Sequence, residues 1–132
     1  MNDEQPDGIR RALLALLPAL ALPEISSAQD AVQTQPQSYR VAFENDRVRV
    51  LDYNGRPGMG VCGEGMHSHP PHLAVILSNG KVRIKTPDGK VEVLNDVPIG
   101  SVVWKEAETH EVENIGGTNV RVLIIELKPA HG

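Results

Sequence analysis

The stretch GMGVCGEGMHSHPPH, residues 58–72, carries most of the chemistry of this 132-residue chain. At its centre is His67-Ser68-His69, followed by His72 and an apolar run over residues 73–77. Alternate side chains of a β-strand point to the same face, so we expect the rings of His67 and His69 to lie side by side. Two neutral imidazoles at that spacing favour a shared cation, because protonated rings would repel each other. Taken alone, such a pair is also common among ordinary core and surface histidines.

Short runs rich in valine and isoleucine surround this stretch, and turn residues separate them. Residues 81–85 alternate, and the following Thr86-Pro87-Asp88-Gly89-Lys90 is typical of a hairpin turn that returns through residues 91–93. We expect Glu92 to lie near the cationic face of the first strand of this hairpin. Other strands are expected at 47–51, 73–77, 101–105, 110–115 and 119–128. Several short antiparallel strands in about 90 residues predict an all-β sandwich or barrel.

Composition excludes several classes of function. Hydrophobic residues make up 40% of the chain and charged residues 23%, which is typical of one soluble domain. The net charge is −4 and the basic residues are scattered, so we expect no nucleic-acid partner, because such binding needs clustered Lys and Arg. A single cysteine excludes an intramolecular disulfide framework and a multi-cysteine zinc cluster.

The N-terminus has the features of an export signal. Arg10-Arg11 precede an apolar run from Ala12 to Leu22, which is too short to cross a bilayer as a helix. Ser26 and Ala28 are small residues suited to a cleavage site. We therefore expect residues 1–28 to be a signal peptide and the protein to be periplasmic or secreted, with no membrane contact after processing. A short helix packed on the domain is the alternative, and the protein would then be cytoplasmic.

Residues 29–38 are polar, contain Pro36 and lack apolar periodicity, so they are predicted to be a linker. The folded domain is then expected to span residues 39–132. Its last strand breaks alternation at Leu123-Ile124-Ile125, which predicts burial on both faces. We expect a homodimer that covers one of these faces, and an inner position in a larger sandwich would explain the same pattern.

Two groups of residues resemble, in order, the two sequence motifs of the cupin superfamily. The residues that match the first motif are His67, His69 and Gly80, and those that match the second are Gly100, His110 and Asn114. The resemblance extends from Phe43 to Leu127. It implies a single-domain cupin, a jelly-roll β-barrel that holds a metal ion inside, with His67, His69 and His110 as ligands.

The chain departs from the cupin pattern at the carboxylate ligand. Counting back from Gly80, the position of the usual glutamate holds Leu73, and His72 is the candidate that would complete the site. Glu106 and Glu108 stand where the family usually has a Pro-x-Gly turn. Three imidazoles leave open coordination positions and suit Fe, Ni, Cu or Zn ions better than Mg or Ca.

The resemblance to three-histidine Fe(II) dioxygenases implies an oxygenase or isomerase of a small metabolite. The alternative is a non-catalytic periplasmic protein that binds a metal or a small ligand, and a barrel kept as a scaffold without metal is a third, weaker reading. Whether the protein is an enzyme stays open. Copper binding is a variant of the binding hypothesis, because the sulfur-bearing residues Met59, Cys62 and Met66 precede the histidine pair.

We expect ordinary structural roles for four other residues near the two motifs. Glu64 and Glu108 are the acids closest to the predicted site, and solvated loop positions are favoured for both. Trp104 is expected to fill the barrel. Asn114 is expected either to orient His110 or to lie against a neighbouring turn.

Overall fold

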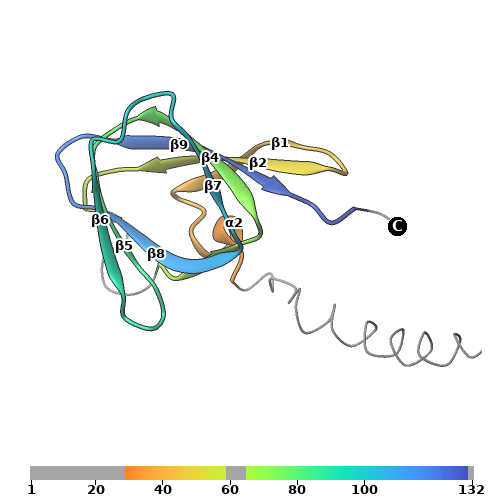
Figure 1. Ribbon diagram of the computed structural model, residues 1–132, viewed down its shortest axis with the longest axis horizontal. Helices are drawn as coiled ribbons and strands as arrows, with labels where there is room; N and C mark the ends of the chain where they lie inside the picture. Colours follow the sequence, from red (N-terminus) through yellow and green to blue (C-terminus); the bar gives the residue numbers. More distant parts are fainter. Residues whose placement is uncertain (1–28, 59–64, 131–132) are drawn as a thin grey trace, which may run out of the picture.

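Nine strands pair into two antiparallel sheets in the part of the chain that the computed structural model describes, residues 29–58 and 65–130 (Figure 1). One sheet has five strands in the order β1 (Tyr39–Glu44), β2 (Val48–Gly55), β9 (Val120–Leu127), β4 (His72–Ser78) and β7 (Val102–Lys105). The other has four strands in the order β3 (His67–His69), β8 (Glu108–Asn114), β5 (Lys81–Lys85) and β6 (Val91–Asn95). The prediction of an all-β chain is confirmed, and two facing sheets are consistent with a jelly roll.

The predicted signal peptide, residues 1–28, lies outside the described residues. None of the helices in the described part of the chain is long and apolar enough to cross a membrane. Residues 29–38 differ from the linker expected there, because they contain the short helix α2 (Ala31–Thr34) and pack on the domain. Ala31 is fully buried in the core, and the carbonyl of Gln29 accepts a hydrogen bond from the Ser68 amide (2.6 Å). Pairing with β3 thus orders a segment that has no apolar periodicity of its own.

The hairpin of β5 and β6 forms as expected, but Glu92 lies on the other face from the one predicted. A five-residue connection sets Lys85 opposite Val91, so Glu92 pairs with Ile84. Directly opposed residues share a face, and a register change of one residue exchanges the two faces. Glu92 therefore lies on the same face as Ile84, at the edge of the cavity, and is exposed.

The last strand, β9, lies in the middle of the five-stranded sheet, between β2 and β4. Val122 and Ile124 face the interior, while Leu123 and Ile125 alternate with them on the outer face and are half-buried. This central position accounts for the broken alternation without a partner subunit. The homodimer stays a prediction.

The structure shows where Trp104 and Asn114 lie, two residues whose roles were predicted from the sequence. Trp104 does not fill the interior: it pairs with Leu73 on the outer face of β7 and is 46% exposed, while its neighbour Val103 points inward. The reason is the strand period, which puts Val103 rather than Trp104 opposite the inward Ala74. Asn114 is buried against a turn, and its amide donates to the carbonyls of Gly55 (2.8 Å) and Thr118 (2.7 Å).

Candidate metal centre

The pairing of β3 with β8 brings the two histidine motifs together. His67 lies opposite His110, and His69 lies opposite Glu108. Because opposed residues and alternate residues share a face, all four side chains point into the interior. Ser68 lies on the other face, where its hydroxyl contacts that of Thr109 (2.6 Å). The strand register alone thus joins residues that are about forty positions apart in the sequence.

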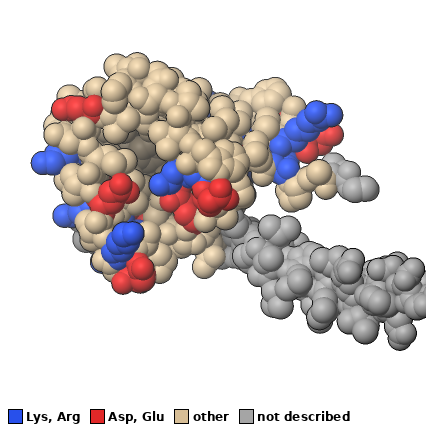
Figure 2. All heavy atoms as spheres, viewed as in Figure 1, with Lys and Arg blue, Asp and Glu red and all other residues tan. Residues whose placement is uncertain are grey.

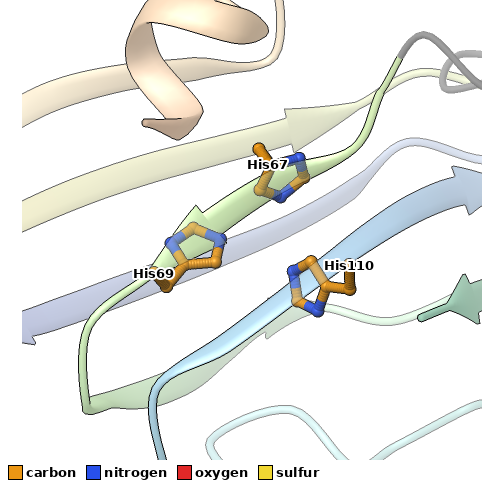
Figure 3. Close-up of side chains that lie close together, drawn as sticks. All are labelled: His67, His69 and His110. Carbon is orange, nitrogen blue, oxygen red and sulfur yellow. The ribbon is translucent and has the colours of Figure 1, made fainter. Parts of the chain in front are cut away.

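Three imidazole rings form a compact buried cluster, shown in Figure 3. The centroid of the His67 ring lies 4.9 Å from those of His69 and His110, and the latter two are 5.2 Å apart. Each ring offers one nitrogen, and these three atoms lie within 4.8 Å of one another. The exposed fractions are 2% for His67, 0% for His69 and 7% for His110. This arrangement is suited to a single small cation.

Hydrogen bonds fix the tautomers of the two β3 histidines. Nδ1–H of His67 donates to the carbonyl of Gly65 (2.5 Å), so Nε2 accepts from the Tyr39 hydroxyl (2.9 Å). Nδ1–H of His69 donates to the Glu126 carboxylate (2.9 Å). Both rings therefore carry their proton on Nδ1 and leave the lone pair on Nε2, which is the state that a metal ligand requires.

Unpaired nitrogens show that the cluster fits a cation. Nε2 of His69 and Nε2 of His110 are buried and find no hydrogen-bond partner among the described residues, whereas Nδ1 of His110 lies 3.3 Å from the Glu108 carboxylate. Buried polar atoms are normally hydrogen-bonded, and leaving one unpaired costs roughly 1–3 kcal/mol. A cation bound by these nitrogens removes that cost, in competition with Tyr39 for the lone pair of His67.

Burial and the proximity of other imidazoles keep the rings of His67 and His69 uncharged. Burial, and next the proximity of His110, lower the pKa of both His67 and His69 to about 3. Burial also raises the pKa of the Tyr39 hydroxyl well above its usual value. The imidazoles of His67 and His69 are therefore neutral at physiological pH without any need for a metal to displace protons.

His72 lies next to the cluster and outside it. Its ring is 5.1 Å from that of His69, and both of its nitrogens face oxygen atoms. Nδ1 contacts the carbonyl of Pro70 (2.7 Å), and Nε2 lies 3.3 Å from the Glu108 carboxylate. His72 is not one of the three histidines whose ligand nitrogens lie within 4.8 Å of one another, and its role as a fourth ligand stays a prediction.

Two carboxylates that sequence reasoning did not assign to the site lie beside it. Glu126 contacts His69 and also Arg49, whose Nε–H donates to it (2.8 Å), and Arg49 in turn pairs with Asp30. Glu126 is 2% exposed, so this chain of contacts holds the His69 ring from behind. Glu126 could have been found in the sequence as an acid at an inward position of an apolar strand.

Glu108 is not the solvated loop residue that was expected, since it is the first residue of β8 and only partly exposed. Its carboxylate lies 3.3 Å from His72 Nε2, 3.3 Å from His110 Nδ1 and 3.7 Å from Lys105 Nζ. Burial opposes its ionisation, but these neighbours together lower the pKa of Glu108. Because Glu108 lies opposite His69 of β3, its side chain faces the interior.

Leu73, which occupies the position of the usual cupin glutamate, points away from the site. Leu73 pairs with Trp104 and Ile125 on the outer face of its sheet, whereas His72 and Ala74 face inward. Carboxylates near the site come instead from β8 and β9. Met59, Cys62 and Glu64 lie outside the described residues, so the copper hypothesis has no structural test here.

No protein-family model matches this chain, and no curated protein matches its sequence. Solved structures do resemble it. A cupin domain from Bordetella pertussis Tohama I is 27% identical, with a TM-score of 0.60, over 69% of this chain and 92% of that one. A cupin superfamily protein from Desulfitobacterium hafniense DCB-2 is 20% identical, with a TM-score of 0.51, over 69% of this chain and 76% of that one. An RmlC-like cupin family protein from Methanocaldococcus jannaschii is 11% identical, with a TM-score of 0.53, over 68% of this chain and 78% of that one.

The two-sheet fold and the buried cluster of histidines from two separated motifs identify this chain as a β-protein with an internal site. With these structural neighbours, the chain is a member of the cupin superfamily, as its motifs predicted.

Proposed function

We propose that this protein binds one divalent transition metal ion through His67, His69 and His110 and acts on a small organic molecule held beside that ion. The observation that carries the proposal is the set of buried imidazole nitrogens that lack partners in the described structure. Three neutral nitrogen ligands leave coordination positions open, which is typical of catalytic rather than structural sites. A closed jelly-roll barrel around the site belongs to the same proposal.

The bound ion supplies Lewis acidity and, if it is iron or copper, redox chemistry. The protein contributes the orientation of the ligands. Glu126 and the Gly65 carbonyl hold the Nδ1 protons of His69 and His67, and these contacts leave Nε2 of both rings unprotonated. Glu108 places a carboxylate beside the cluster, where it is able to accept or return a proton of the substrate.

Elemental analysis of protein purified without added metal tests the metal site. We expect about one transition metal ion per chain in the wild type and almost none in His67→Ala or His110→Ala. Ser68→Ala is the matched control, because Ser68 lies between two ligands on the opposite face of β3. Variants of both histidines that retain the wild-type metal content would show that the site is elsewhere.

Oxygen uptake separates an enzyme from a binding protein. The Fe(II)-loaded protein is supplied with candidate thiols and catechols, and an oxygenase consumes oxygen in proportion to substrate. The position of Glu108 beside the cluster favours the enzyme. If no metal supports turnover of any substrate, the non-catalytic periplasmic binding protein becomes the better interpretation.

A second copy of this chain is the partner we propose for the outer face of the five-stranded sheet. Strand register aligns five apolar side chains in one row across that face: Phe43, Val50, Ile125, Leu73 and Trp104. Phe43 and Trp104, at the two ends of the row, are 55% and 46% exposed. A two-fold dimer needs one self-complementary patch, and an uncharged row fits that requirement.

A further inference from the structure

An internal cavity of about 380 Å³ adjoins the histidine cluster. Both sheets line it, and Figure 2 shows a hollow in the molecular surface on the side that faces the viewer. Its size lies at the lower end of the roughly 300–1,000 Å³ that small-molecule sites occupy. The cavity therefore has room for a small organic molecule.

The walls of the cavity are mostly aliphatic. The five-stranded sheet contributes Ala74, Ile76 and Val122, and the facing sheet contributes Val82 and Val112. Apart from Val82 on β5, these residues occupy inward positions of strands that carry His72, His110 or Glu126 two or four positions away. An apolar body placed along them loses contact with water without leaving any buried polar group unpaired.

Charged groups in the cavity wall lie mainly at the histidine end. Lys105 and Glu108 are there, 3.7 Å apart, whereas Glu92 is exposed on the edge strand β6 and is screened by water. Arg49 is shared between the carboxylates of Glu126 and Asp30, so this group carries one surplus negative charge. If the proposed function is correct, three neutral imidazoles add no charge to a divalent ion, and the surplus carboxylate offsets only one of its two positive charges.

We infer that the cavity binds a small apolar molecule with a single anionic oxygen-bearing head group, such as a carboxylate, with the head at Lys105 and the histidine cluster. The aliphatic walls take the body of the molecule. This inference rests on the proposed function, because the bound metal ion supplies most of the positive charge. It restricts the substrate to molecules that have an apolar body and one negative charge.

Isothermal titration of the zinc-loaded protein with octanoate tests the inference, with octan-1-ol, octylammonium and acetate as comparison ligands. We expect octanoate to bind at least tenfold more tightly than each of the other three, since each lacks either the anionic head or the apolar body. Lys105→Ala is expected to weaken octanoate binding several-fold and to leave octan-1-ol binding unchanged.

A matched pair of variants on β4 tests the location. Ala74→Phe fills the cavity and should weaken octanoate binding at least tenfold, whereas Val75→Phe adds the same ring on the outer face and should leave binding unchanged. Val82→Phe, in the facing sheet, replaces Ala74→Phe if that variant does not fold. Equal effects of the inward and outward substitutions would overturn the inference.

Zinc content measured in the same samples separates the two proposals. If the protein contains zinc but does not bind octanoate, or binds octylammonium as tightly as octanoate, the proposed ligand class is wrong. The proposed metal site is then unaffected. Protein that takes up no zinc overturns the proposed function itself.

Discussion

The two ends of the interior are built from the same strands and differ in chemistry. At one end β4, β8 and β9 present polar side chains, which are His72, His110 and Glu126. Two or four residues along, the inward side chains of the same strands are Ile76, Val112 and Val122. One set of strands thus carries a polar end, next to the histidine cluster, and an aliphatic wall; we propose that the first holds a metal ion and the second a ligand. Substitutions at the polar end should change metal binding, and substitutions elsewhere should not.

Glu126→Gln should have the largest effect. It removes the charge that pairs with Arg49 and replaces the carboxylate that accepts from His69 with a neutral amide, which is a weaker acceptor. Loss of such a supporting contact weakens metal binding by roughly 10–100-fold, and loss of one partner of a buried ion pair costs about 3–5 kcal/mol. Zinc affinity by chelator competition and urea unfolding measure the two effects.

Glu113→Gln is the control for Glu126→Gln. Glu113 pairs with the exposed Arg83 at the surface, and such pairs contribute at most about 1 kcal/mol. Zinc affinity that is the same in both variants would remove Glu126 from the site.

Acid should destabilise the metal-free protein through the polar end alone. The folded state keeps His67 and His69 neutral, with pKa values of about 3, whereas both rings take up protons below about pH 6.5 in the unfolded chain. The unfolded state binds more protons, so stability falls as the pH falls. We expect a loss of about 2 kcal/mol between pH 6.5 and 5.5, about 1 kcal/mol for each histidine, in urea titrations. In His67→Gln about half of that pH dependence should remain, and a flat profile in the wild type would contradict the burial argument.

Asp30→Asn should have a smaller effect at the same end. The Asp30 side chain contacts Arg49, which in turn pairs with Glu126, so its loss should weaken zinc binding by a few-fold and stability by about 1 kcal/mol. Glu44→Gln, which removes the ion pair with Lys128, is the surface control. If Asp30→Asn leaves zinc affinity at the wild-type value, the N-terminal segment does not support the site.

Trp104→Lys should leave both ends of the interior unchanged and alter only the association of the chains. We expect sedimentation equilibrium to give a dimer for the wild type and a monomer for the variant, with equal metal content in both. A monomeric wild type would show that the apolar row on the outer face does not bind a second copy.

The strands and the His67–His69 pair were predictable because both depend on local signals. Alternation and turn residues indicated most strands, and the spacing of His67 and His69 placed their rings on one face of β3. His110 joined them through its resemblance to the second cupin motif. The structure confirms that all three side chains meet.

What sequence reasoning missed depends on register and on pairing across sheets. Glu92 changed faces because of the length of one hairpin connection, and Trp104 because it pairs with an outward residue. Glu108 and Glu126 acquire their roles from contacts with histidines on other strands, which no local pattern encodes. The packing of Ala31 is likewise invisible in a polar segment.

X-ray absorption spectroscopy of the zinc-loaded protein examines the proposed ligands themselves. Three imidazole nitrogens at about 2.0–2.1 Å, with the remaining positions filled by oxygen, are expected if His67, His69 and His110 hold the ion. A sulfur scatterer at about 2.3 Å would place Cys62 at the metal, and a fourth imidazole would bring in His72. Either result would contradict a centre made of these three histidines.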